Sequence, residues 1–264
     1  MEFGQHNIRK SAVAGSFYPG DQSVLKREIE NYFSRTGAVV DNKKIRALLV
    51  PHAGTVYSGQ VAAWGYRQLP KLVSPHFVLI GPSHHVAFDG LAASGAEIWK
   101  TPLGAVSHVP PKKLTSQIVI SDGVHEDEHD LEVQLPFLQH LFHDFSFTAF
   151  ATGVAIDIDA VSSYIQKEYP DSVIIISSDL SHYLPDDVAR GKDKKTIEAI
   201  LHGDTEYIMS EDNVACGHVA VTVAMNLAKK NKWASQLVRS DTSATAFGDT
   251  SEVVGYASII WYEQ

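Results

Sequence analysis

The chain alternates between short apolar runs and longer segments in which apolar residues recur at helical spacing. The apolar runs are rich in Val, Ile and Leu, and such runs suit strands that are buried on both faces of a sheet. They cover Ile45–Val50, Phe77–Ile80, Phe145–Ala151, Val173–Ile176 and Val253–Trp261. Helical spacing is found at Ser23–Phe33, Tyr57–Leu69, His129–Phe142, Asp157–Glu168, Asp187–Leu201 and Val214–Lys229. Strands that alternate with helices predict an α/β protein whose mostly parallel sheet is covered by helices on both faces.

The chain shows no mark of a domain boundary. It contains no internal repeat, no low-complexity tract and no Pro/Gly/Ser linker long enough to separate two units. The segment Leu91–Val109 alternates less clearly and contains Pro102 and Gly104, so we expect a strand-and-loop excursion there. We therefore expect one α/β domain over residues 1–264.

A histidine follows each of three predicted strands: His52, His84 and His182. In an open parallel sheet, ligands bind beyond the carboxyl ends of the strands, so these three imidazoles are expected to converge. Neutral imidazole is the commonest metal-binding side chain and suits Fe, Cu, Zn or Ni, which predicts a metal site. The alternative is that each histidine separately caps a loop or a helix. Asp179 is a candidate to hold the second ring nitrogen of His182, although an Asx turn explains it equally well.

Composition narrows the function classes. The 31 acidic and 22 basic side chains give a formal net charge of −9, which argues against nucleic acid as a partner. Neither a signal peptide nor an apolar run long enough to span a membrane is readable, so we expect a cytoplasmic protein without a membrane partner. The single cysteine, Cys216, excludes an internal disulfide and a cluster of thiolate ligands.

Six motifs together resemble the Memo family, in that family's order and over nearly the whole chain. They are AGSFYP at 14–19, PHAG at 51–54, GPSHH at 81–85, EDEHDLEVQLPFL at 126–138, SSDLSH at 177–182 and VVGYA at 253–257. The family is similar in fold to the class III extradiol dioxygenases, which hold Fe(II) with two histidines and a carboxylate. The resemblance implies a doubly wound, three-layer α/β/α sandwich. It also implies that His52 and His84 are metal ligands and that His182 lines the same pocket.

The third metal ligand is not settled by the resemblance. In well-known Memo relatives a cysteine shortly before the VVGYA-like strand supplies it, but the stretch 243–249 contains no cysteine here. Asp249, His182, Cys216 or a water molecule therefore remain candidates. A cysteine at the start of a helix, as expected for Cys216, more often packs than binds. The resemblance also implies that His129 and Glu132 face the metal pocket, whereas helix capping and surface charge are their alternative roles.

The segment from His125 to His129 matches the H-E-x-x-H signature of zinc metalloproteases. That geometry requires both histidines to lie within one helix. Acidic residues crowd the segment after Asp122, as they do in the first turn of a helix, so we expect the helix to begin near Glu128. His125 then lies outside it, and a metalloprotease is a remote alternative.

Two functions fit these observations. One is a metal-dependent oxidoreductase of unknown substrate, with Fe(II), or Cu or Zn in its place, held by His52 and His84 together with a third ligand. His182, assisted by Asp179 and His129, would then transfer protons. The other is a non-catalytic module that binds a metal or a peptide and acts with partner proteins. The resemblance further implies a shared pathway with an AMMECR-type protein and a radical SAM enzyme, whose genes often lie beside those of Memo-like proteins.

Overall fold

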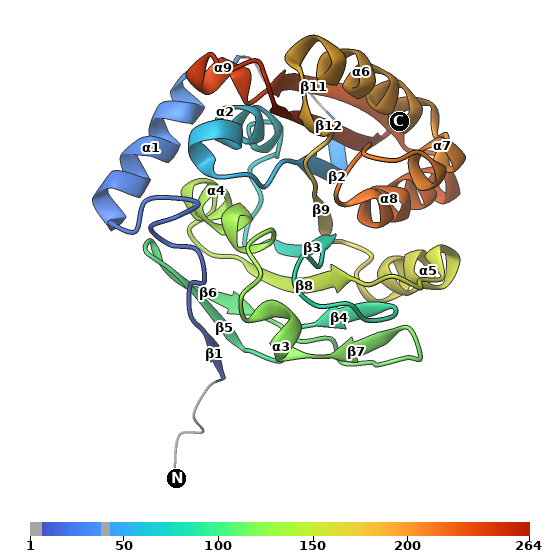
Figure 1. The fold of residues 1–264 in the computed structure, drawn as a ribbon. Coiled ribbons are helices and arrows are strands. Elements are labelled where there is room, and N and C mark those ends of the chain that lie inside the picture. Colours follow the sequence, from blue (N-terminus) through green and yellow to red (C-terminus); the bar gives the residue numbers. More distant parts are fainter. Residues whose placement is uncertain (1–6, 38–42) are drawn as a thin grey trace.

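A central sheet lies between two layers of helices in the computed structural model, which describes residues 7–37 and 43–264 (Figure 1). The strands are β1 (Ile8–Arg9), β2 (Lys44–Val50), β3 (His76–Pro82), β4 (Leu91–Ala93), β5 (Ile98–Thr101), β6 (Gly104–His108), β7 (Ile118–Ile120), β8 (Ser146–Thr152), β9 (Val173–Ser177), β10 (His182–Leu184), β11 (Ala234–Thr242) and β12 (Val253–Glu263). The helices are α1 (Gln22–Ser34), α2 (Thr55–Tyr66), α3 (Asp122–His125), α4 (Leu135–Leu141), α5 (Ile158–Glu168), α6 (Asp186–His202), α7 (Thr205–Ser210), α8 (His218–Asn231) and α9 (Ala244–Phe247).

The sheet is mixed rather than purely parallel. Its main path runs β1-β5-β6-β8-β3-β9-β2-β12-β10, and the central strands β8, β3, β9 and β2 are parallel to one another. Strand β12 pairs antiparallel with β2, and β11 pairs antiparallel with β12. An apolar run that is buried on both faces looks the same in either direction, so the sequence pattern did not show the direction of β12.

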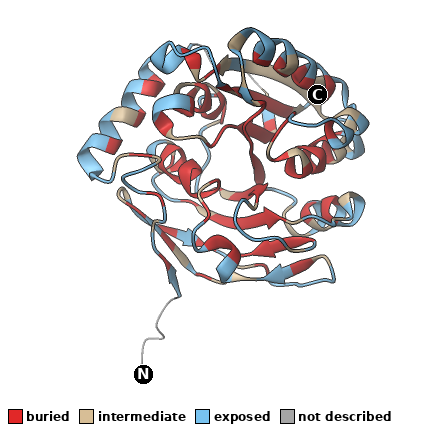
Figure 2. Ribbon diagram, in the orientation of Figure 1, coloured by how far each residue is buried: buried red, intermediate tan, exposed pale blue. Residues whose placement is uncertain are grey.

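Each face of the sheet carries its own hydrophobic core. Alternate residues of β2 point to opposite faces, so Leu48 packs with α1, α2 and α4, whereas Leu49 packs with α5, α6, α7 and α8. Buried residues accordingly line the sheet and the inner sides of both helix layers (Figure 2). This arrangement confirms the predicted three-layer α/β/α sandwich.

The connections differ from the sequence pattern at one important place. The helix predicted for His129–Phe142 begins later, because a 3-10 turn at Glu132–Gln134 precedes α4 and Pro136 lies near the start of α4. His129 is therefore left in irregular backbone. The excursion predicted at Leu91–Val109 is confirmed as β4, β5 and β6. Among the residues that the structure describes, no helix is both long enough and apolar enough to cross a membrane.

A candidate metal centre at the carboxyl ends of the central strands

The parallel strands bring two of the predicted histidines together. Strands β2 and β3 end at Val50 and Pro82 on the same edge of the sheet, and His52 and His84 each follow two residues later. Their ring centroids lie 5.2 Å apart, with the two rings nearly perpendicular. His52 is 2% exposed, whereas His84 is partly open to solvent. The convergence expected from the sequence is therefore present for this pair.

Cys216 completes a group of three metal-ligand types. One ligand atom from each of His52, His84 and Cys216 lies within 4.8 Å of the others, and Cys216 Sγ is 3.1 Å from His52 Nε2. Gly217 allows this approach, because a Cβ at that position would meet the Ser177 carbonyl oxygen at 2.8 Å. Among the side chains considered for the third ligand, Cys216 is the one placed with both histidines.

A second group shares His84 and adds Glu128 and His129. The Glu128 carboxylate accepts hydrogen bonds from the backbone N–H of His84 at 2.6 Å and from its Nδ1 at 2.9 Å. It also lies 3.0 Å from Nδ1 of His129, whose ring centroid is 4.6 Å from that of His84. Burial would raise the pKa of Glu128, but hydrogen bonds from His129 and His84 outweigh it and hold the pKa below its usual range. Sequence reasoning treated Glu128 only as part of an acidic helix start.

Burial keeps the side chains of His52 and Cys216 uncharged. It lowers the pKa of His52 well below its usual value, and the neighbouring His129 and His84 lower it further. Burial likewise raises the pKa of the Cys216 thiol above its usual value. In the metal-free protein His52 is therefore a neutral imidazole and Cys216 a thiol.

The other predicted site residues have different surroundings. His182, in β10, lies outside both groups, and its Nδ1 donates to the Leu180 carbonyl oxygen at 2.8 Å. That ring nitrogen therefore bonds Leu180 rather than Asp179, whose carboxylate accepts from the backbone N–H of His52 at 2.8 Å. Asp249 is exposed and bonds the backbone and hydroxyl of Ser251, which removes it from the cluster. The role of His182 as a ligand stays a prediction.

Glu132 is neither surface charge nor part of either ligand group. It is fully buried and lies 2.5 Å from Nη1 of Arg9 and from the hydroxyl of Tyr18. It also accepts from the backbone N–H groups of Ala12 and Val13. Glu132 therefore anchors the amino-terminal segment against the segment that carries Glu128 and His129.

The H-E-x-x-H match does not form the helix that a metalloprotease needs. Helix α3 ends at His125, whose Nε2 donates to the Ala92 carbonyl oxygen at 2.9 Å in a buried position. His129 lies beyond the end of that helix and bonds Glu128. The two histidines therefore do not share a helical face, and the motif match is coincidental.

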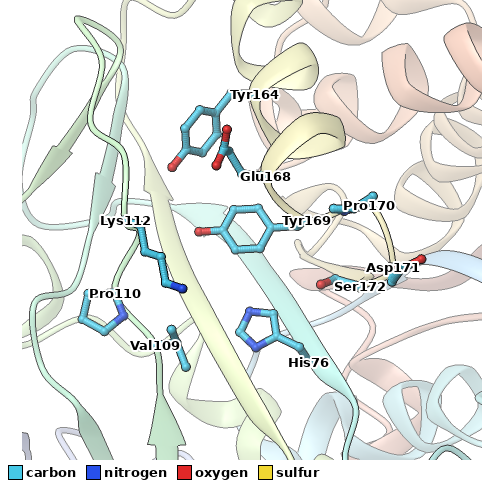
Figure 3. A pocket seen from close by; sticks show the side chains of 10 residues that line it. All are labelled: His76, Val109, Pro110, Lys112, Tyr164, Glu168, Tyr169, Pro170, Asp171 and Ser172. Carbon is cyan, nitrogen blue, oxygen red and sulfur yellow. The ribbon is translucent and has the colours of Figure 1, made fainter.

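One cavity borders the cluster, and another lies at the opposite end of β3. The first has a volume of about 400 Å³ and is lined by His84, Cys216 and His218, together with the loops 82–87 and 152–154. The second contains His76 stacked on Tyr169 (Figure 3). Both ring nitrogens of His76 bond the hydroxyls of Ser146 and Thr148, so that imidazole has no free nitrogen for a ligand. The cavity beside Cys216 is the one where a ligand would reach the clustered side chains.

Comparisons with known proteins show which family this chain is similar to. A family model described as Memo-like protein matches residues 9–260. A MEMO1 family protein of Methanococcoides burtonii is 37% identical, and the match covers 96% of this chain and 99% of the relative. MEMO1 family proteins of Ignicoccus hospitalis and Thermotoga maritima are 36% and 35% identical, each over 96% of this chain and over 98% and 99% of the relatives.

Proposed function

The chain belongs to the Memo-like family, and we propose that it is a metal-dependent oxidoreductase that binds one divalent transition metal, Fe(II), through His52, His84 and Cys216. The observation that carries the proposal is the proximity of two imidazoles and a thiol, with ligand atoms within 4.8 Å of one another. They converge at the edge of the sheet where α/β proteins bind their ligands.

The donor set fits such a metal. Imidazole and thiolate ligands suit iron, zinc and copper ions, and neutral His52 binds without first losing a proton. His84 donates through Nδ1 to Glu128, an arrangement that orients metal-binding histidines in proteins and makes them more basic. Three protein ligands leave open positions, at which a bound metal supplies Lewis-acid and redox chemistry to a substrate.

Side chains near the proposed metal would bind a substrate and accept a proton from it. The cavity beside His84 and Cys216 has space for a small organic molecule. His129 donates through Nδ1 to ionised Glu128, so its Nε2 is available to accept a proton from a hydroxyl group. His182, with Nδ1 held by Leu180, offers Nε2 as a further proton acceptor. A reducing cytoplasmic environment fits this proposal, because it keeps the Cys216 thiol available.

Metal analysis of anaerobically prepared protein tests the binding step. We expect close to one Fe(II) per chain, with His52→Ala and His84→Ala losing it and the exposed control His143→Ala retaining it. Unchanged metal content in the first two variants would refute the site.

Oxygen uptake with a panel of catechols and small phenols tests the catalytic step. Metal-dependent uptake above the level of His52→Ala supports an oxidoreductase. One bound metal without any uptake instead identifies a non-catalytic metal-binding module.

A further inference from the structure

We propose that Ser177 is a positioning residue that fixes the tautomer of His52. Its hydroxyl holds the ring proton on Nδ1, so that the lone pair of Nε2 is directed at Cys216. The inference rests on the proposed function, because it concerns how one ligand of the same metal site is oriented. It goes further by assigning the direction of each hydrogen bond behind that ligand.

The hydroxyl of Ser177 has three close neighbours. Its Oγ lies 2.8 Å from the Asp130 carbonyl oxygen, 2.8 Å from Gln134 Nε2 and 3.0 Å from His52 Nδ1. A hydroxyl has one proton to donate and two lone pairs to accept with. A carbonyl oxygen only accepts, so the Ser177 proton goes to Asp130. Both lone pairs are then left for Gln134 and His52.

The orientation of the Gln134 amide is fixed from its other side. Its Nε2 also donates to the Pro51 carbonyl oxygen at 3.0 Å, and its Oε1 accepts from the Tyr66 hydroxyl at 2.9 Å. A flipped amide would place Oε1 against two oxygen acceptors, Pro51 and Asp130, which repel it. Gln134 and Tyr66 are fully buried, so water does not replace these partners. Gln134 therefore donates to Ser177, and the Ser177 proton is not directed toward it.

Nδ1 of His52 is consequently the donor in its contact with Ser177. A neutral imidazole carries one ring proton, so Nε2 keeps its lone pair. That atom lies 3.1 Å from Cys216 Sγ, where it accepts the thiol proton in the metal-free protein and is ready to bind a metal. The opposite tautomer would set the Nδ1 lone pair against an oxygen whose only proton is already used. Ser177 thus prepares the ligand before any metal arrives.

The same structure provides internal references for this assignment. His84 and His182 place Nδ1 against the acceptors Glu128 and Leu180, so both are expected to carry the proton on Nδ1. His125 is the opposite case, because its Nε2 faces the Ala92 carbonyl oxygen. One spectrum must therefore contain both tautomers.

Long-range 1H–15N NMR of the metal-free, 15N-labelled protein reads each tautomer directly. The His52→Gln variant identifies the His52 signals. We expect the Nδ1–H form for His52 and the Nε2–H form for His125. In the Ser177→Ala variant, His52 should shift toward the Nε2–H form. The affinity of this variant for zinc should fall about 10- to 100-fold relative to the wild-type protein. The matched control is Ser162→Ala, a fully buried serine in α5 whose hydroxyl donates to the Ile158 carbonyl oxygen, and it should change neither.

Two outcomes overturn the inference: a predominant Nε2–H tautomer of His52 in the wild-type protein, or an unchanged His52 tautomer in Ser177→Ala. Unaltered His125 signals show that each variant is folded, so a loss of structure is not mistaken for a loss of positioning. If the wild-type and variant tautomers are as stated but no metal binds, the proposed function fails while the role of Ser177 stands.

Discussion

Cys216 Sγ lies 3.1 Å from Nε2 of His52, which joins a thiol and an imidazole from segments far apart in the chain. Burial raises the pKa of the thiol and lowers that of the imidazole, so the contact is between two neutral groups. A metal ligand must be deprotonated, and His52 already meets this requirement at neutral pH. Cys216 does not, so the proposed metal binding through Cys216 would be coupled to the loss of the thiol proton.

This coupling predicts the pH dependence of metal affinity. Below the pKa of the Cys216 thiol, one proton is released for each metal bound, so affinity should rise about tenfold per pH unit through the neutral range. Cys216→Ser should bind more weakly, and the dependence on pH should be shallower because no thiol is ionised. Competition titrations with zinc and a chelator at several pH values measure both quantities. An identical slope in the wild type and the variant would exclude the thiol as a ligand.

Glu128 offers a second prediction about metal affinity. Its carboxylate accepts hydrogen bonds from Nδ1 of His84 and Nδ1 of His129. Glu128→Gln therefore removes a charge that orients two imidazoles. Loss of such a partner typically weakens metal binding about 10- to 100-fold. The neighbouring Glu126→Gln serves as the control, because Glu126 is exposed. Equal zinc affinities for the two variants would show that Glu128 does not support the site.

The sequence located the two histidines because apolar runs mark where strands end, and because the alternation of strands with helices predicts parallel central strands. His52 and His84 each follow such a run, and parallel strands bring their ends to one edge. Cys216 follows no strand, and its approach depends on the close packing of Gly217 against β9, which no local pattern encodes. Glu128 was hidden in an acidic run that is equally typical of a helix start.

Elements at the margin of the sheet were harder to predict than those at its centre. Strand β11, Ala234–Thr242, is half-buried and contains polar residues along its length, so it lacks the apolar run that marked β9. The helix expected after His129 likewise begins only after a 3-10 turn at Glu132–Gln134, and Glu132 is buried there against Arg9 and Tyr18. A buried ion pair between residues 9 and 132 cannot be inferred from periodicity, because both side chains belong to types that are usually exposed.

That ion pair gives a prediction about stability. Arg9 reaches Glu132 through Nη1, and its other guanidinium nitrogens donate to the carbonyl oxygens of His125 and Glu128. Arg9→Met would leave a buried carboxylate without its cation, which should lower the free energy of unfolding by about 3–5 kcal/mol. Urea denaturation measures the loss, and Arg67→Met is the control, because Arg67 is exposed immediately after the end of α2. A change as small as that of the control would show that the ion pair contributes little.

Acid sensitivity should arise in part from His108. Burial lowers its pKa to about 4, although its hydrogen bond to the Ala96 carbonyl oxygen opposes the shift. Its Nε2 accepts from the Ala149 N–H at 3.1 Å, so a second ring proton would face another donor. In the unfolded chain the pKa is about 6.5, and between these two values the unfolded state binds more protons than the native state.

The sign of the effect follows from that difference. The stability contributed by neutral His108 is complete above about pH 6.5 and is lost as the pH falls toward 4, by about 3 kcal/mol in total. His125, whose pKa burial also lowers to about 4, should add a loss of similar size over the same range. The variant His108→Gln should therefore unfold with a shallower pH dependence than the wild type between pH 6.5 and 4, because the His108 contribution is removed while those of His125 and of buried His52 remain. Urea denaturation at several pH values measures this slope, with exposed His143→Gln as the control. A wild-type slope in His108→Gln would mean that acid acts elsewhere in the protein.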